Sequence, residues 1–302
     1  MSINRSYIDV AFRNDYGKRD IGGSVYDHYA IRKHTHYPTR IVHHESMSTS
    51  TLKKNIKKAE FHLHVCPGET LDDDFKVYPK ATCQMNEILE NGGLLFLPGI
   101  SREASSHPEG LRKIFEIELI RKAKLNGKPI LGVCGGAALL LESYGGSLEK
   151  VDNHNCRGGM PRIGVKNMIV NNREMHKICV EKDTVLGSVV NEFMEKIALR
   201  TEDIMVNSVH NFAPQYMPPI LEKNAVACRD KQHPNLSESI EGFEAKFGAP
   251  VFGVLWHPEA YQQGPSKYFL RYMEQAGDAY VKKRACLKEF RQKAKKLPPN
   301  KL

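Results

Sequence analysis

A cysteine set between glycines is the residue of this chain best suited to nucleophilic chemistry. Cys134 lies in the run Gly132-Val133-Cys134-Gly135-Gly136, after the apolar segment Ile130–Val133 and before the apolar residues 137–141. The pattern predicts a buried strand, a sharp turn and a helix, which is the nucleophile elbow written G-x-C-x-G instead of G-x-S-x-G. Such a turn lifts the sulfur above a helix N-terminus whose amides and dipole favour a thiolate. An inert cysteine in a small-residue turn is the alternative interpretation.

His257 and Glu259 are the residues that could assist a cysteine nucleophile. The apolar residues 251–256 precede the sequence His257-Pro258-Glu259. In an extended segment, residues i and i+2 point to the same side, and Pro258 stiffens the backbone between them. A histidine serves as both base and acid near neutral pH, and a carboxylate can fix its tautomer. We therefore predict a catalytic triad of Cys134, His257 and Glu259, in that chain order.

The chain resembles the class I glutamine amidotransferase-like proteins, and within them the γ-glutamyl hydrolase branch (peptidase family C26). The similarity extends from about residue 88 to about residue 275 and is carried by several segments in the family's order. Besides the elbow and the His-Pro-Glu segment, the matching residues are 92–100, 115–129, 206–210 and 240–243. The resemblance implies a hydrolase acting on C–N bonds, which cleaves a γ-glutamyl amide through a thioester intermediate. It implies a small-molecule or peptide substrate and neither a metal nor an organic cofactor.

The chain departs from the family pattern around the expected oxyanion hole. By resemblance, that hole is formed by backbone amides of the loop at Gly99 and Ile100 and by the amide of Gly135. The family has a second glycine where Ile100 stands. Backbone amides survive a side-chain change, so the hole is still expected. However, isoleucine disfavours positive φ, which predicts a differently shaped loop.

The substrate pocket also departs from the family pattern. Ser208 and His210, in a Val-Asn-Ser-x-His signature, are expected by resemblance to bind the glutamyl group. Capping of nearby backbone groups is the alternative for both residues. Ala138 stands where the family has a glutamine that holds substrate, and Phe212 stands where a second glutamine is common. These changes predict ordinary chemistry on an unusual substrate.

The order of apolar segments predicts an α/β fold. We expect a flavodoxin-like, doubly wound and mostly parallel sheet with helices on both faces, whose ligands bind beyond the carboxyl ends of the strands. Residues 1–275 are expected to form the catalytic domain, with residues 1–87 the most weakly matched part. The strands are predicted at residues 7–12, 40–44, 61–65, 94–97, 130–133, 164–170, 177–180, 204–206, 225–229 and 252–256. Helices are predicted at residues 25–33, 115–123 and after the elbow.

The net charge of +9 is a property of the C-terminus. Residues 281–302 hold nine lysines and arginines against Glu289 alone, which is +8 of the total. Leu287, Phe290, Ala294 and Leu297 recur at helical spacing, so residues 276–302 are predicted to form a basic amphipathic helix and tail. Packing on the domain is the simpler expectation, and contact with an acidic partner or an anionic surface is the other. Nucleic acid is disfavoured because no stacking aromatics alternate with the basic residues.

The seven cysteines and the polar start of the chain favour a cytoplasmic protein. An odd number of cysteines without regular spacing indicates reduced thiols, so the six besides Cys134 are expected to be packing or surface residues. Residues 1–5 lack the apolar core of a signal peptide, and no apolar run reaches membrane-spanning length.

Two other functions are compatible with these motifs. One is a glutaminase subunit that passes ammonia to a synthetase, although Ala138 and the lack of an ATP-binding glycine-rich loop disfavour it. The other is a non-hydrolytic binding or regulatory protein that retains the fold. The altered substrate residues favour that second possibility, and a complete triad argues against it.

Overall fold

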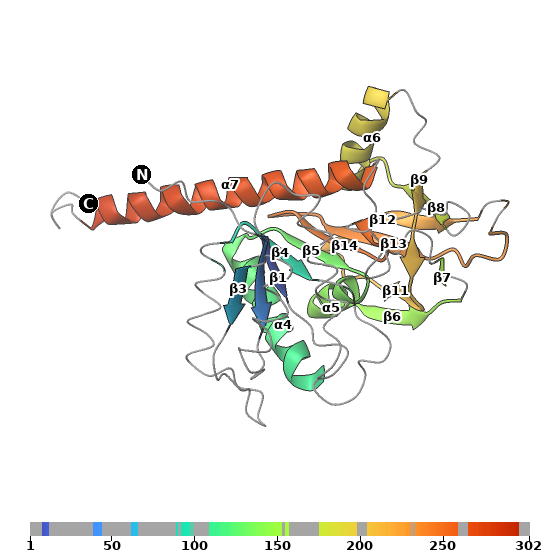
Figure 1. Cartoon of the computed structure of the whole chain (residues 1–302), viewed down its shortest axis with the longest axis horizontal. Coiled ribbons are helices and arrows are strands. Elements are labelled where there is room, and N and C mark those ends of the chain that lie inside the picture. The colour runs from blue at the N-terminus through green and yellow to red at the C-terminus, as the bar shows by residue number, and fades with distance from the viewer. Residues whose placement is uncertain are drawn as a thin grey trace.

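The computed structural model describes residues 8–11, 39–43, 62–65, 89, 92–97, 99, 109–152, 155–156, 175–197, 204–229, 231, 233–258 and 265–295. A ten-stranded sheet runs through the molecule (Figure 1). Its order is β3 (His62–Val65), β2 (Thr39–His43), β1 (Ile8–Ala11), β4 (Leu94–Leu97), β5 (Ile130–Val133), β14 (Val251–Val254), β13 (Ile240–Ala245), β12 (Leu221–Cys228), β8 (His176–Val180) and β9 (Ile204–Val206).

The sheet is mixed, so the expectation of a mostly parallel sheet is wrong. All pairings from β3 to β14 are parallel. The pairings from β14 through β13, β12 and β8 to β9 are antiparallel. Residues 246–250 alone connect β13 to β14, and so short a connection cannot form the crossover that a parallel pair requires. Among the described residues, two antiparallel pairs of strands lie outside this sheet. They are β6 (Ser147–Lys150) with β11 (Phe212–Tyr216) and β7 (Asn155–Cys156) with β10 (Ser208–Val209).

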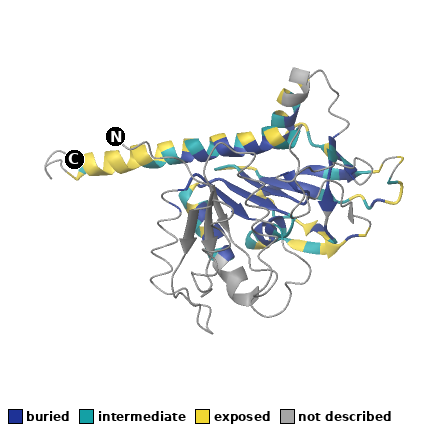
Figure 2. Cartoon of the chain, viewed as in Figure 1, coloured by how far each residue is buried: buried dark blue, intermediate teal, exposed yellow. Residues whose placement is uncertain are grey.

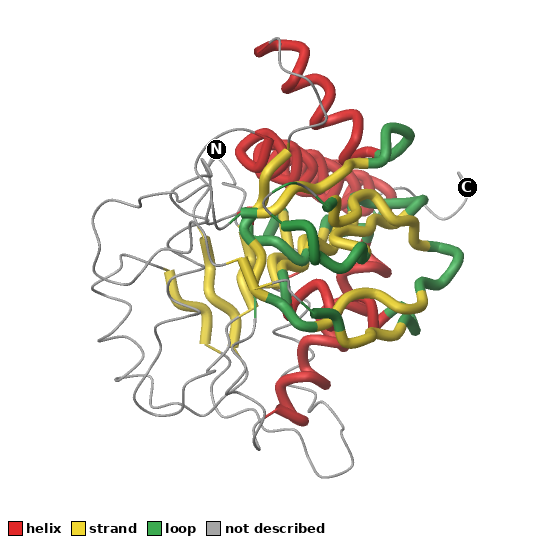
Figure 3. Tube along the Cα trace, turned by 90° about the vertical axis from the view of Figure 1, so that its right-hand side faces the viewer, coloured by secondary structure: helices red, strands yellow, loops and turns green. Residues whose placement is uncertain are grey.

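Helices cover both faces of the sheet, as predicted. Successive side chains of a strand point to opposite faces, and β4 shows the consequence. Leu95 and Leu97 join the core formed with α4 (Glu109–Asn126) and α5 (Gly135–Ser143). Leu94 and Phe96 join the core formed with α6 (Val185–Ile197) and α7 (Pro265–Ala294). Figure 3 shows the helices on either side of the strands, turned by 90° from Figure 1.

The predicted strands at residues 94–97, 130–133 and 204–206 have the bounds that the structure gives them. Helix α4 confirms the helix predicted at residues 115–123 and is longer. Helix α6 was not predicted. The helix predicted at residues 25–33 and the strand predicted at residues 164–170 lie outside the described residues. Within the described part of the chain, no helix is long and apolar enough to cross a membrane.

A buried carboxylate ties helix α6 to the sheet. The backbone N–H groups of Val185 and Leu186 donate to Glu244 Oε1 and Oε2 of β13 at 2.6 and 3.1 Å. Asn224 Nδ2 donates to Glu244 Oε2 at 3.0 Å from the neighbouring strand. The negative charge therefore satisfies the free amides at the helix N-terminus, where the helix dipole also favours it. Thr184 Oγ1 accepts the N–H of Gly187 at 3.0 Å and completes this cap.

Helix α7 begins on the domain and ends well beyond it. Phe269 and Met273 are buried in the core, and Tyr280 Oη donates to the backbone carbonyl of Leu89 at 2.6 Å. After Arg284 nearly every residue is exposed, as Figure 2 shows by the yellow outer half of the helix. The helix predicted in the basic C-terminal segment is therefore present. The proposed boundary between residues 275 and 276 falls within α7, which is one continuous helix.

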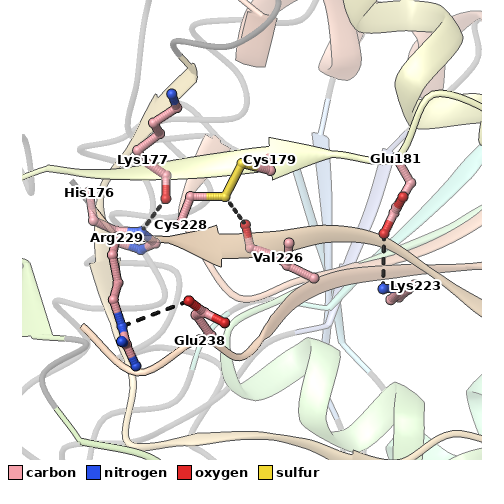
Figure 4. The surroundings of a disulfide bond; sticks show 9 residues. All are labelled: His176, Lys177, Cys179, Glu181, Lys223, Val226, Cys228, Arg229 and Glu238. Carbon is pink, nitrogen blue, oxygen red and sulfur yellow. Dashed lines mark hydrogen bonds and ion pairs between the residues drawn. A yellow bond between two sulfur atoms is a disulfide. The ribbon is translucent and has the colours of Figure 1, made fainter. Parts of the chain in front are cut away.

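Two cysteines predicted to be unpaired form a disulfide. Cys179 on β8 and Cys228 on β12 are bonded, with their Cα atoms 6.0 Å apart (Figure 4). The two strands are antiparallel neighbours, so sheet pairing brings together residues that are 49 positions apart in sequence. Cys134 and Cys286 are free thiols. The expectation that Cys179 and Cys228 are reduced is thus wrong, because spacing in the sequence does not show which strands pair.

Candidate active site

Cys134 occupies a strained turn between β5 and α5. Its φ of 49° and ψ of −113° make it the one non-glycine residue with positive φ in the described part of the chain. A side chain rarely adopts this conformation, and such strain persists only where the surrounding structure enforces it. The Cys134 N–H donates to the carbonyl of Val254 at 2.8 Å, and the Cys134 carbonyl accepts the N–H of Ala138 at 3.1 Å. The geometry is that of a nucleophile elbow.

The two glycines that flank the elbow are required by close backbone approach. A Cβ on Gly132 would lie 2.7 Å from the carbonyl oxygen of Gly136, on the first turn of α5. A Cβ on Gly136 would overlap the carbonyl oxygen of Leu97 on the neighbouring strand β4. The turn can therefore be this sharp only with glycine at both positions, as the G-x-C-x-G pattern indicates.

The structure brings Gly99, Cys134 and His257 together. A Cβ built on Gly99 would lie 3.0 Å from His257 Cε1, 3.8 Å from His257 Nε2 and 3.5 Å from Cys134 Cβ. The space left free by the missing side chain of Gly99 is therefore bordered by both the Cys134 Cβ and the His257 ring. Any side chain at position 99 would be crowded by the His257 ring. His257 itself is 6% exposed, so its ring is largely shielded from solvent.

Pairing of β14 with β5 accounts for this meeting. The two strands are parallel neighbours with Val254 opposite Val133. The segments that follow both strands therefore leave the sheet at the same edge. Cys134 follows Val133 directly, and His257 follows Val254 after two residues. The carboxyl ends of parallel strands are where open α/β sheets bind ligands.

The backbone of His257 is held from another segment. Its N–H donates to Asn207 Oδ1 at 3.3 Å, and the preceding Trp256 forms a β-bridge with Ser208. Sequence reasoning singled out Ser208 from this segment but assigned nothing to Asn207. An asparagine after a short apolar strand gave no sign of which backbone group it would reach.

Of the remaining residues of the predicted site, some lie outside the described residues and others are described. Glu259 and Ile100 are among those outside. Gly135 is the first residue of α5, where a backbone N–H has no partner within the helix, and Gly99 lies against the cysteine. Both glycines are partly exposed, as an oxyanion hole requires.

Ser208 and His210 both face the protein interior. Ser208 is fully buried, and its hydroxyl has no hydrogen-bond partner among the described residues. His210 Nδ1 lies 3.0 Å from the carbonyl oxygen of Phe212, and its Nε2 lies 3.1 Å from Glu241 Oε1. Both ring nitrogens of His210 are thus engaged within the protein. For His210, this geometry favours the backbone-capping alternative over contact with a substrate.

Two positions that differ from the family pattern, Ala138 and Phe212, are both accessible to solvent. Ala138 lies one helical turn after Cys134 and is partly exposed. Phe212, at the start of β11, is 54% exposed. In the described part of the chain, no three His, Cys, Asp or Glu side chains are grouped as metal ligands would be.

A family model described as Peptidase C26 matches residues 98–259, a segment that contains the elbow and the His-Pro-Glu motif. The chain belongs to the Peptidase C26 family. This family is class I glutamine amidotransferase-like, as the sequence motifs indicated. Protein NtpR of Enterococcus hirae is 29% identical over 184 residues, which cover 58% of this chain and 67% of NtpR.

Solved glutamine amidotransferase structures are among those to which this chain is similar. The glutaminase domain of CTPS from Trypanosoma brucei, with bound acivicin, is 14% identical and has a TM-score of 0.48, covering 89% of this chain and 94% of that one. A glutamine amidotransferase from Thermotoga maritima is 16% identical with a TM-score of 0.41, covering 82% and 86%. These low values add nothing about the activity of the Peptidase C26 protein described here.

Proposed function

We propose that this protein is a cysteine hydrolase that cleaves γ-glutamyl amide bonds through a γ-glutamyl thioester on Cys134. The observation that carries the proposal is that Cys134 and His257 both border the space where a side chain of Gly99 would lie. A strained cysteine at an elbow and a buried imidazole beside it form the pair that thiol catalysis requires. Family membership supports the reaction class.

The first half of the reaction forms the thioester. The Cys134 thiolate attacks the γ-carbonyl carbon of the substrate, and the carbonyl oxygen becomes an oxyanion. Backbone amides at Gly135 and in the loop at Gly99 donate to that oxyanion. His257 gives its proton to the amide nitrogen as the C–N bond breaks, and the free amine departs. Glu259 orients the imidazole in the proposed triad, by analogy with the family.

The second half releases the acid. Neutral His257 removes a proton from a water molecule, which attacks the thioester carbon. The tetrahedral intermediate collapses with loss of the Cys134 thiolate, and the γ-carboxyl group of the product is set free. The proton taken from water remains on His257, so thiolate and imidazolium are restored together.

Labelling with diazo-oxo-norleucine, an electrophilic glutamine analogue, tests the proposal. Peptide mass spectrometry should locate one stoichiometric adduct at Cys134, and the Cys134→Ala variant should take none. The unlabelled protein should release free amine from γ-glutamyl amides, and the labelled protein should release none. Absence of an adduct while iodoacetamide still alkylates Cys134 would contradict a γ-glutamyl pocket.

A further inference from the structure

A buried cluster of two histidines and one glutamate lies beside the strand that leads to His257. Glu241 is fully buried on β13, and His176 is fully buried at the start of β8. His210 Nε2 lies 3.1 Å from Glu241 Oε1 and 3.3 Å from Oε2. His176 Nε2 lies 3.8 Å from Glu241 Oε2, and Ser239 Oγ donates to Glu241 Oε1 at 3.4 Å.

A hydrogen bond that needs an additional proton joins His210 to Glu241. A backbone carbonyl only accepts, so His210 Nδ1 must carry the proton that it donates to the carbonyl of Phe212 at 3.0 Å. His210 Nε2 faces a carboxylate, so a second proton must lie between them, on the ring or on the acid. The pair therefore holds one proton more than a neutral imidazole and a carboxylate. Such a charge-assisted hydrogen bond is strong when buried and costly to break.

Glu241 also holds the strand that carries His257. Its backbone carbonyl accepts the N–H of Leu255 at 2.8 Å, two residues before His257. Its neighbour Gly242 is paired with Val254, the last residue of β14. Glu241 therefore binds the segment after β14 through its main chain and His210 through its side chain.

The segment between Val206 and His210 is anchored at both ends. Val206 is paired with His176 in the β8–β9 ladder, and His210 is bound to Glu241. Between these anchors, Asn207 Oδ1 accepts the N–H of His257 at 3.3 Å, and both residues are buried. His257 lies beyond the last ladder pair of β14, so side-chain support takes the place of sheet pairing there.

We propose that Asn207 is a positioning residue for His257, held in register by the His176–Glu241–His210 cluster. The inference rests on the proposed role of His257 as partner of Cys134. Removing Asn207 Oδ1 leaves the buried N–H of His257 without this acceptor, which is unfavourable for a buried donor. In the variant, the backbone at His257 turns away from this position, which moves the imidazole from its place beside Gly99 and Cys134.

The test measures alkylation of Cys134 by iodoacetamide from about pH 5 to about pH 9, the range in which thiols and imidazoles titrate. Peptide mass spectrometry separates Cys134 from the other cysteines. The proteins compared are wild type, His257→Ala, Asn207→Ala and Asn224→Ala, each confirmed as folded by circular dichroism. Asn224→Ala is the matched control, since Asn224 is equally buried but its amide supports Glu244 instead.

We expect Asn207→Ala to alkylate roughly tenfold more slowly at neutral pH, because an unassisted thiol is only a few per cent thiolate there. Its pH profile should approach that of His257→Ala, whereas Asn224→Ala should keep the wild-type profile. If Asn207 had only a structural role, the alkylation profile would change equally in both asparagine variants or in neither. Either result overturns the inference. A His257→Ala profile identical to wild type would instead overturn the proposed Cys–His chemistry, and the positioning role with it.

Two glutamate variants test the cluster. In Glu241→Gln, the amide can donate to Nε2 of a neutral His210, whose Nδ1 still donates to Phe212. Glu241→Ala provides no such group. We expect Glu241→Gln to retain the wild-type alkylation profile and Glu241→Ala to resemble Asn207→Ala. Equal profiles for Glu241→Ala and wild type would remove the cluster from the positioning of Asn207.

Discussion

The backbone N–H of Cys134 donates a 2.8 Å hydrogen bond to the carbonyl of Val254, so β5 and β14 remain joined up to the residue that carries the sulfur. Cys134, the proposed nucleophile, and the strand leading to His257 are therefore joined by one hydrogen-bonded ladder. In this position Cys134 adopts an unfavourable φ of 49°. The elbow is a place where the sheet fixes the reactive group at the expense of local stability.

Strain at Cys134 predicts an unusual order of variant stabilities. An alanine must still adopt the positive φ, which costs about 1–3 kcal/mol, while glycine adopts it freely. Cys134→Gly should therefore be about 1 kcal/mol more stable than Cys134→Ala in urea unfolding, after the greater entropy of unfolded glycine is subtracted. Neither variant should form the thioester. An alanine variant as stable as the glycine variant would show that the turn stores no strain.

Gly136 is predicted to tolerate no side chain. A Cβ there would overlap the Leu97 carbonyl, and a backbone group of a central strand cannot move away cheaply. We expect Gly136→Ala to lower the free energy of unfolding by about 3 kcal/mol or more. The control is Gly248→Ala, where a Cβ meets nothing within 4 Å and only the positive φ of 93° matters. That variant should lose about 1 kcal/mol. Equal losses would contradict the packing explanation.

The Cys179–Cys228 disulfide is predicted to stabilise the antiparallel half of the sheet. Closing a loop over 49 positions restricts the unfolded chain by about 4 kcal/mol in the chain-entropy description. The double variant Cys179→Ser/Cys228→Ser should therefore unfold at a lower urea concentration. Cys286→Ser, at an exposed free thiol on α7, should change stability by less than about 0.5 kcal/mol. Titration of both thiols in the untreated, unfolded protein would contradict the bond.

Tyr144, at the end of α5, predicts a pH effect on stability. Burial raises the pKa of its phenol from 10 to about 12. The unfolded chain loses this proton above about pH 10 while the folded protein retains it, so stability is full below pH 10 and falls as pH rises toward 12. In Tyr144→Phe this fall should be shallower, as measured by urea midpoints across the window. The ring that faces Lys124 Nζ at 3.3 Å is retained in that variant. Equal slopes would refute the assignment.

The outer end of α7 is predicted to contribute little to folding. Truncation after Ala285 removes exposed residues and keeps Arg284, whose Nη1 lies 3.3 Å from Asn126 Oδ1. The free energy of unfolding should change by no more than about 0.5 kcal/mol. Tyr280→Phe, on the buried part of the same helix, removes the donor to the Leu89 carbonyl and should cost about 1–3 kcal/mol. A large loss on truncation would mean that the exposed end supports the fold.

Local patterns in the sequence were sufficient for the elbow and for several strands. Gly132, Cys134 and Gly136 are near neighbours in the chain, and their spacing alone determines a strand, a turn and a helix. The strands at residues 94–97 and 130–133 are short apolar runs with the predicted bounds. Helix α6 went unpredicted because its N-terminus is capped by Glu244, which is 58 positions away from Leu186.

The sequence by itself determined the strand, turn and helix around Cys134 and the family, because these depend on residue types and on spacing between near neighbours in the chain. Only the tertiary structure decided which strands pair, and hence the mixed sheet and the Cys179–Cys228 bond. It also brought Cys134 and His257 together beside Gly99, and placed His210 next to Glu241. Those relationships depend on strand order and burial across long separations, which residue spacing along the chain does not record.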